Sequence, residues 1–151
     1  MTLTKGRRIL VVEDDPGLVF LLEEIFASID PDARLDWIKD GDRAIAEFRA
    51  NLLRGEDRRY DMIISDNYLD GESSGIDLWR VCQELDPEIL FLVISAMSLD
   101  KFFGAIGPDV IIPPFLQKPF SVAEGKRVIE GLLAYADHRT MARTGMMGRT
   151  G

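Results

Sequence analysis

Short, largely apolar runs alternate along the chain with segments whose apolar residues recur every three or four positions. The strand-like runs are Ile9–Val12, Arg34–Ile38, Met62–Ser65, Ile89–Ile94 and Phe115–Gln117. Most of them are apolar at nearly every position, which is typical of strands that are buried on both faces. The pattern therefore predicts five strands in one parallel sheet.

The segments between these strands have the periodicity of helices. The first has apolar residues at Leu18, Leu21, Leu22, Ile25, Phe26 and Ile29. Ser121 and Glu124 form the S-x-x-E pattern of a capping box and predict where the last helix begins. Gly104, Gly107 and Pro108 predict a short fourth helix, because Gly and Pro are poor helix residues. Strands alternating with helices predict an α/β fold with helices on both faces of the sheet.

The chain has 151 residues, which suits one domain with a full hydrophobic core. We expect that domain to cover residues 6–137. Residues 138–151 consist largely of Arg, Thr, Met and Gly without an apolar period, so we expect a disordered tail.

The formal net charge of −8 argues against non-specific binding to nucleic acid or to anionic membranes, which requires a basic surface. No apolar run is long enough to span a bilayer, and the N-terminus lacks the pattern of a secretory signal. The single cysteine, Cys82, excludes an intramolecular disulfide. We therefore expect a cytoplasmic protein.

Acidic residues follow two of the predicted strands directly. Glu13, Asp14 and Asp15 come after the first strand, and Asp66 comes after the third. Parallel α/β sheets bind ligands outside the carboxyl ends of their strands, and carboxylate oxygens suit Mg²⁺. Asp15 precedes Pro16, so we expect it to cap a helix rather than to bind metal.

Four motifs occur in order at the predicted strand ends: ILVVEDDP, IISDNYLDGESSG, FLVISA and FLQKPF. Together they resemble the receiver domain of two-component response regulators, from about Arg8 to Ala136. The resemblance implies a flavodoxin-like (βα)5 three-layer sandwich with strand order 2-1-3-4-5.

The resemblance also implies a set of roles at the strand ends. Asp66 would accept a phosphoryl group from a sensor histidine kinase or a histidine phosphotransfer protein. Mg²⁺ would be held by Glu13, Asp14, Asp66 and the backbone carbonyl of Tyr68. The domain would be a switch rather than an enzyme, with at most self-phosphorylation and self-dephosphorylation.

Three further residues match the motifs beyond the acidic cluster. By the resemblance, Lys118 supplies a cation for the phosphoryl oxygens and Ser95 supplies a hydroxyl that binds the phosphoryl group. Phe115 matches the aromatic switch residue that turns inward, although a simple core position is an equal alternative. Output would act in trans, through a protein partner or by onward phosphoryl transfer, and a homodimer is one of the assemblies we expect.

The sequence departs from the usual receiver pattern in the loop Asn67–Gly75 and in the short fourth helix. Asp70 replaces the usual proline of that loop, and Gly75 comes one residue late. These departures keep a rival hypothesis open, namely a degenerate receiver that binds partners without phosphorylation. A Mg²⁺-dependent phosphohydrolase is less favoured, because Tyr68 stands where such enzymes place an acid. A flavin-binding protein is disfavoured because the acids would repel phosphate.

Overall fold

The computed structural model describes residues 6–67, 71–108 and 110–148, and the side chains of residues 143–148 are not described. The strands are β1 (Arg8–Val12), β2 (Arg34–Ile38), β3 (Met62–Ser65), β4 (Leu90–Ser95) and β5 (Phe115–Gln117). The helices are α1 (Pro16–Ile29), α2 (Gly41–Leu52), α3 (Gly75–Leu85), α4 (Leu99–Ile106) and α5 (Val122–Gly148), with a 3-10 turn η1 (Glu56–Arg58) before β3.

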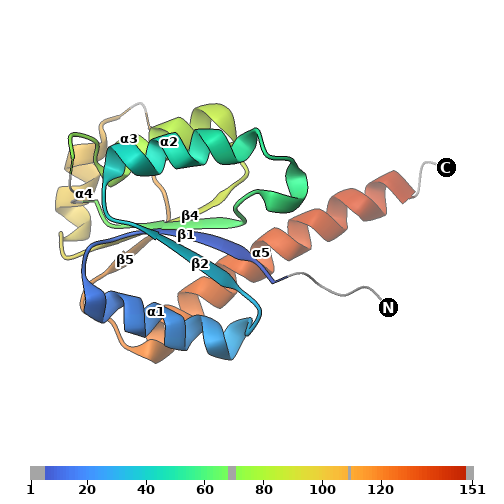
Figure 1. The fold of residues 1–151 in the computed structure, drawn as a ribbon, viewed down its shortest axis with the longest axis horizontal. Helices are drawn as coiled ribbons and strands as arrows, with labels where there is room; N and C mark the ends of the chain where they lie inside the picture. The colour runs from blue at the N-terminus through green and yellow to red at the C-terminus, as the bar shows by residue number, and fades with distance from the viewer. Residues whose placement is uncertain (1–5, 68–70, 109, 149–151) are drawn as a thin grey trace.

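The five strands form one parallel sheet in the order β2-β1-β3-β4-β5 (Figure 1). Val12 at the end of β1 pairs in register with Ser65 at the end of β3. Ser95 at the end of β4 pairs with Gln117 at the end of β5. The residues that follow these strands therefore emerge at the same edge of the sheet, as the sequence predicted.

Each face of the sheet carries its own apolar core. On one face the alternate β1 residues Ile9 and Val11 pack with buried residues of α1 and α5. On the other face Leu10 and Val12 pack with α2, α3 and α4 (Figure 1). The architecture is a flavodoxin-like (βα)5 three-layer sandwich, because both faces of a parallel sheet must be covered.

Polar caps fix where the helices begin, and thereby where the site loops end. The Asp15 carboxylate accepts a hydrogen bond from Gly17 N–H, so Asp15 caps α1 as predicted. Ser121 and Glu124 form the predicted capping box at the start of α5. Helix α4 ends at Ile106 before Gly107, which has a φ of 85°, so this helix is as short as its glycines and proline predict.

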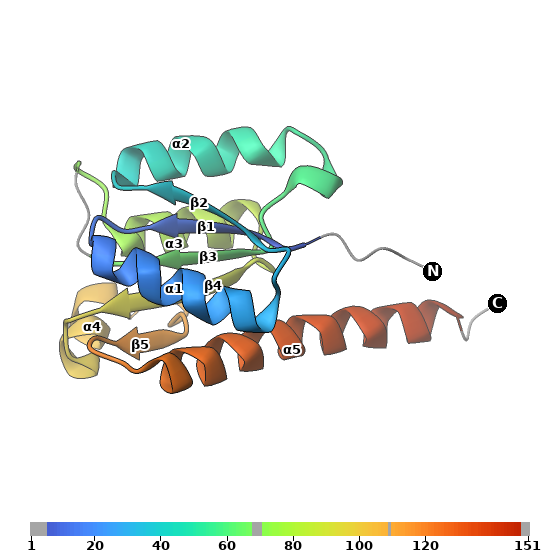
Figure 2. The same ribbon diagram turned by 60° about the horizontal axis from the view of Figure 1, so that its bottom comes forward.

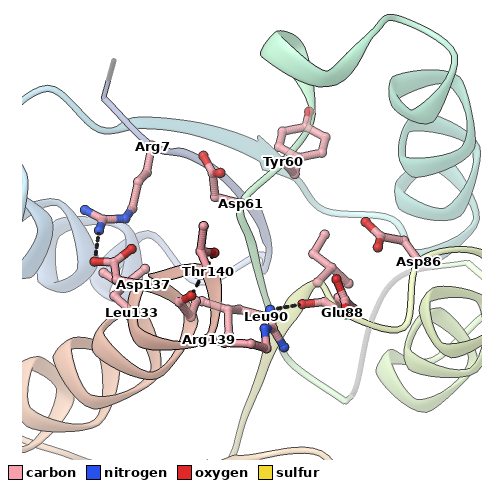
Figure 3. Close-up of a pocket in the computed structure, with 12 residues that line it drawn as sticks. Arg7, Tyr60, Asp61, Asp86, Glu88, Leu90, Leu133, Asp137, Arg139 and Thr140 are labelled. Atoms are coloured by element: carbon pink, nitrogen blue, oxygen red, sulfur yellow. Dashed lines mark hydrogen bonds and ion pairs between the residues drawn. The ribbon is translucent and has the colours of Figure 1, made fainter. Parts of the chain in front are cut away.

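The prediction of a disordered tail from residue 138 is wrong for residues 138–148, because α5 continues to Gly148 and projects past the sheet (Figure 2). No proline interrupts this segment, and side-chain contacts at Asp137 and Arg139 attach its beginning to the rest of the domain. The Arg7 guanidinium donates to the Asp137 carboxylate at 2.9 Å, and Arg139 donates to the Glu88 carbonyl at 2.8 Å (Figure 3). These long-range contacts leave no periodic signal in the sequence.

Length alone does not make α5 a membrane helix. Within the described ranges, no helix combines enough length with enough apolar residues to cross a membrane.

Candidate functional site

Lys118 joins two of the predicted carboxylates at the carboxyl edge of the sheet. Its Nζ lies 2.8 Å from Glu13 Oε2 and 3.0 Å from Asp66 Oδ2. The three side chains come from the ends of β1, β3 and β5, and only the side chain of Lys118 has substantial exposure, at 20%. The structure therefore brings together three of the residues predicted from the sequence.

Backbone hydrogen bonds set the positions of these three residues. Glu13 N–H donates to the Ile38 carbonyl and Asp66 N–H donates to the Val12 carbonyl, both at 3.0 Å. Lys118 N–H donates to the Ser95 carbonyl at 2.9 Å, and the Lys118–Pro119 peptide bond is cis. The sheet ladder thus continues for one residue beyond the strands and carries the site residues with it.

Glu13 is the most buried carboxylate of the site. Its Oε1 accepts hydrogen bonds from the backbone N–H groups of Asp14 and Asp15, each at 3.1 Å, while Oε2 accepts from Lys118. Burial raises the pKa of Glu13, and the neighbouring Asp66 charge acts in the same direction against the opposing effect of Lys118. The buried surroundings therefore disfavour the charged form of Glu13, although Lys118 Nζ lies 2.8 Å from its Oε2.

Lys118 responds to the same neighbours in the opposite sense. Burial by itself would lower the pKa of Lys118, but hydrogen bonds and charge attraction from Glu13 and Asp66 raise it overall. Lys118 therefore stays a cation at neutral pH and presents a fixed positive charge beside Asp66.

Two further residues, Asp14 and Tyr68, were also predicted as metal ligands. The Asp14 side chain is exposed on the loop between β1 and α1, and Tyr68 lies outside the described residues. Within the part of the chain that the structure describes, no group of three His, Cys, Asp or Glu side chains is spaced as a metal site. By donor type the residues still fit Mg²⁺, which takes oxygen ligands, usually one or two carboxylates, and keeps several waters.

The predicted switch residues both lie near this edge of the sheet. Ser95 is fully buried at the end of β4, and its hydroxyl oxygen accepts a hydrogen bond from Met97 N–H at 3.2 Å. Phe115 is half-buried, and its ring lies 4.8 Å from that of Phe102, centre to centre. Phe102 is a core residue, whereas Phe103 beside it is 41% exposed.

A set of contacts around the loop after Asp66 was not predicted from the sequence. The Asp42 carboxylate at the start of α2 accepts hydrogen bonds from Glu72 N–H at 3.1 Å and from the Ser73 hydroxyl. Asn67, at the start of this loop, is buried, with 6% exposure. The contact between Asp42 and Ser73 joins residues thirty-one positions apart, so local pattern gave no signal of it.

Comparisons with known proteins agree with this arrangement. The sequence profile described as "Response regulator receiver domain" matches residues 9–130. The chain therefore belongs to the response regulator receiver family. Among curated proteins, none matches the chain.

Solved structures with the same fold are only distantly similar in sequence. A response regulator receiver protein from Sinorhizobium medicae WSM419 is 20% identical with a TM-score of 0.69, and the match covers 87% of this chain and 98% of that one. The signal receiver domain of an HD domain-containing protein from Pseudomonas fluorescens Pf-5 is 17% identical with a TM-score of 0.73, covering 93% and 96%. A chain of the CheX–CheY–BeF3–Mg²⁺ complex from Borrelia burgdorferi is 20% identical with a TM-score of 0.65, covering 84% and 89%.

Proposed function

We propose that this receiver domain accepts a phosphoryl group on Asp66 from a sensor histidine kinase or a histidine phosphotransfer protein, with Mg²⁺, and thereby switches the binding of a protein partner in trans. The observation that carries the proposal is the contact of Lys118 Nζ with Asp66 Oδ2 at 3.0 Å, at the carboxyl edge of the sheet. This edge is where parallel α/β sheets bind their ligands.

Asp66 has the properties required of a phosphoryl acceptor. Its carboxylate would attack phosphorus, so that a P–O bond forms and the P–N bond to the donor histidine breaks, with the electron pair leaving on the imidazole nitrogen. Asp66 is 9% exposed, so a phosphoryl donor would reach its carboxylate while most water is excluded from it. Lys118 would compensate the negative charge of the transferring group, the usual means of catalysing phosphoryl transfer.

The charges of the site support binding of a divalent cation. The carboxylates of Glu13, Asp14 and Asp66 outnumber the single ammonium group of Lys118, and the excess equals the charge that one Mg²⁺ neutralises. When bound, the metal would offset negative charge on the phosphoryl group and on the acids that would otherwise repel an anionic donor. Lys118 would then be released from Glu13 to contact the phosphoryl oxygens.

Switching would follow from a new set of hydrogen bonds. The Ser95 hydroxyl oxygen, which accepts from Met97 N–H, would instead donate to the phosphoryl group at Asp66. Such a change biases a two-state element, here the segment from β4 to β5 that carries Phe102 and Phe115. The chemistry of the domain would be limited to gaining and losing this one phosphoryl group.

Intact-mass measurement tests the proposal directly. The protein is incubated with a small phosphodonor such as phosphoramidate, with and without Mg²⁺, beside Asp66→Ala. We expect a gain of one phosphoryl group that requires both Mg²⁺ and Asp66. A folded protein that gains no mass under these conditions contradicts the proposal.

One observation favours a second candidate function, a receiver that binds partners without phosphorylation. Lys118 pairs with both Glu13 and Asp66, so the site is partly neutralised by the chain's own cation. In that case partner binding would be the same for the native protein and Asp66→Ala. Partner capture measured with and without phosphodonor separates the two functions.

A further inference from the structure

The segment after the phosphoacceptor is fastened to the start of helix α2. The two carboxylate oxygens of Asp42 accept one hydrogen bond each, from Glu72 N–H at 3.1 Å and from the Ser73 hydroxyl. Gly71 packs against Asp40 at a φ of 88°, and a Cβ there would lie 2.8 Å from Asp40 Oδ1. Glu72 and Ser73 are therefore held by Asp42, and Gly71 lies close to Asp40.

The far end of the same segment is hydrogen-bonded to Asn67, the residue that follows Asp66. Gly75 N–H donates to the Asn67 carbonyl at 3.1 Å, and Ile76 N–H donates to Asn67 Oδ1 at 3.2 Å. A Cβ at Gly75 would lie 2.3 Å from the carbonyl oxygen of Asp66, so the two backbones are in close contact. A displacement of residues 71–75 would therefore press directly on the backbone of Asp66.

We propose that Asp42 is a positioning residue for phosphoryl transfer, which holds the segment behind Asp66 so that its carboxylate keeps the orientation needed for attack. This inference rests on the proposed function and assigns a role to a residue outside the acidic cluster. It follows from the chain of contacts that runs from Asp42 through Glu72 and Ser73 to Gly75 and then to Asp66. Small errors in the orientation of a nucleophile lower the rate of transfer steeply.

The place of Asp42 in the fold suits this role. It is the second residue of α2 and lies two positions after Asp40, whose carboxylate caps the helix by accepting from Arg43 N–H at 3.0 Å. A carboxylate in the first turn of a helix is stabilised by the helix dipole. Hydrogen bonds from Ser73 and Glu72 also lower the pKa of Asp42, so it is ionised at neutral pH.

Three variants separate positioning from simple charge. Asp42→Ala removes both hydrogen bonds, and Ser73→Ala removes one without changing the charge. Asp42→Asn removes the charge but keeps an acceptor for Glu72 N–H and a partner for the Ser73 hydroxyl. We expect the maximal rate of phosphorylation at saturating Mg²⁺ to fall about fivefold in Asp42→Ala and about twofold in Ser73→Ala, and to stay close to native in Asp42→Asn.

The dependence on Mg²⁺ concentration gives a second readout. A positioning role lowers the maximal rate and leaves the half-saturating Mg²⁺ concentration unchanged. A purely electrostatic role instead raises that concentration equally in Asp42→Ala and Asp42→Asn and spares Ser73→Ala. The second pattern overturns the proposal, as does an Asp42→Ala protein with the native rate.

Amide hydrogen exchange tests the contact without any phosphorylation. Loss of the Asp42 acceptor should speed exchange of the Glu72 amide roughly tenfold in Asp42→Ala. The matched control is Asp61→Ala, because Asp61 accepts a hydrogen bond from Arg8 N–H at 2.8 Å at the opposite edge of the sheet. This control should leave both the Glu72 amide and the phosphorylation rate unchanged, and native exchange in Asp42→Ala overturns the proposal.

Failure of the two proposals is distinguishable. If the native protein gains no phosphoryl group, the proposed function fails, and the role of Asp42 in it fails too. If the native protein is phosphorylated but the three variants match it, only the role of Asp42 is overturned.

Discussion

The two edges of the sheet each contain a cation shared by two carboxylates, but the two clusters differ in burial and in the geometry of the cation. At the carboxyl edge Lys118 joins Glu13 and Asp66. At the amino edge Arg7 joins Asp30 at 3.3 Å and Asp137 at 2.9 Å. Both clusters tie together three segments that are distant in sequence.

Burial and geometry distinguish the two clusters. The side chains of Glu13 and Asp66 are 2% and 11% exposed, so both carboxylates of that cluster are buried. At the amino edge Asp30 is 14% exposed but Asp137 is 62% exposed, so only one of the two is buried. The planar guanidinium of Arg7 fixes its partners through two separate nitrogens, whereas Lys118 uses one compact ammonium group for both. An ammonium group on a flexible stem is free to turn toward a third acceptor, and an arginine fork already engaged at both sides is not.

Two clusters with the same number of charges thus differ in how strongly water screens those charges. Where water screens it, a cation shared by two carboxylates is a weak ion pair that joins segments of the chain. Where the fold buries it, the same arrangement carries the energetic cost of desolvating its charges. Burial raises the pKa of Glu13, which shows that desolvation disfavours its charged form.

The largest expected difference between the clusters is in Lys118→Ala. Removing the ammonium leaves two buried carboxylates without their cation, so the free energy of unfolding should fall by about 2–3 kcal/mol without Mg²⁺. Added Mg²⁺ should restore part of this loss of stability. The rate of phosphorylation should fall by about a hundredfold, because Lys118 no longer compensates the charge of the transferring group. Urea unfolding with and without Mg²⁺ measures the first effect.

The control for this variant is Lys126→Ala, because Lys126 pairs with Glu130 at 3.8 Å on the exposed side of α5. Its loss should cost no more than about 0.5 kcal/mol. Equal losses in the two variants would contradict the distinction drawn between buried and exposed cations.

Arg7→Ala should have a smaller effect that is confined to the amino edge. We expect a loss of about 1 kcal/mol in the free energy of unfolding and faster amide exchange around Asp137 in α5, because the helix loses one of its fastenings. The phosphorylation rate should stay native. A slower rate would show that the amino edge is coupled to Asp66.

A titration of Glu13 tests whether burial raises its pKa. Its pKa is raised above the ordinary 4.5, so the folded protein should hold this proton at a pH where the unfolded chain has lost it. The stability that Glu13 contributes is therefore complete below pH 4.5 and is lost as the pH rises through the raised pKa. Carbon-13 NMR of the carboxyl group measures the midpoint, and a midpoint at or below 4.5 contradicts the claim.

Salt should give the smallest effect and should sharpen the contrast. Raising NaCl from about 0.1 M to about 1 M shortens the screening length from about 10 Å to about 3 Å. The coupling energy of Arg7 with Asp137, measured by a double-mutant cycle, should fall by a few tenths of a kcal/mol. The coupling of Lys118 with Glu13 should change less, and an equal change would show that water screens both pairs alike.

The sheet could be predicted from the sequence because its signal is local. Three of the five strands have the predicted bounds, β1 begins one residue earlier than predicted, and β4 lies one residue later at both ends. Largely apolar runs thus identify strands that are buried on both faces, to within one residue. The proximity of Glu13, Asp66 and Lys118 could also be predicted, because the carboxyl ends of parallel strands lie at one edge of the sheet.

Other features could not be predicted because they depend on contacts between distant segments. The helix over residues 138–148 lacks an apolar period, and its first turn is held by Arg7 and by the Glu88 carbonyl. The attachment of Ser73 to Asp42 likewise depends on where α2 and α3 lie in the fold. Whether Lys118 contacts Glu13, Asp66 or both is also decided by side-chain geometry rather than by the order of motifs.

The length of α5 gives the domain a lever. Beyond Arg139 the helix continues for about 14 Å to Gly148, at about 1.5 Å per residue. A tilt of about 10° at the turn held by Arg7 and Arg139 would move Gly148 by about 2.4 Å, close to a hydrogen-bond length. Small rearrangements at the sheet would thus arrive enlarged at the far end of the helix.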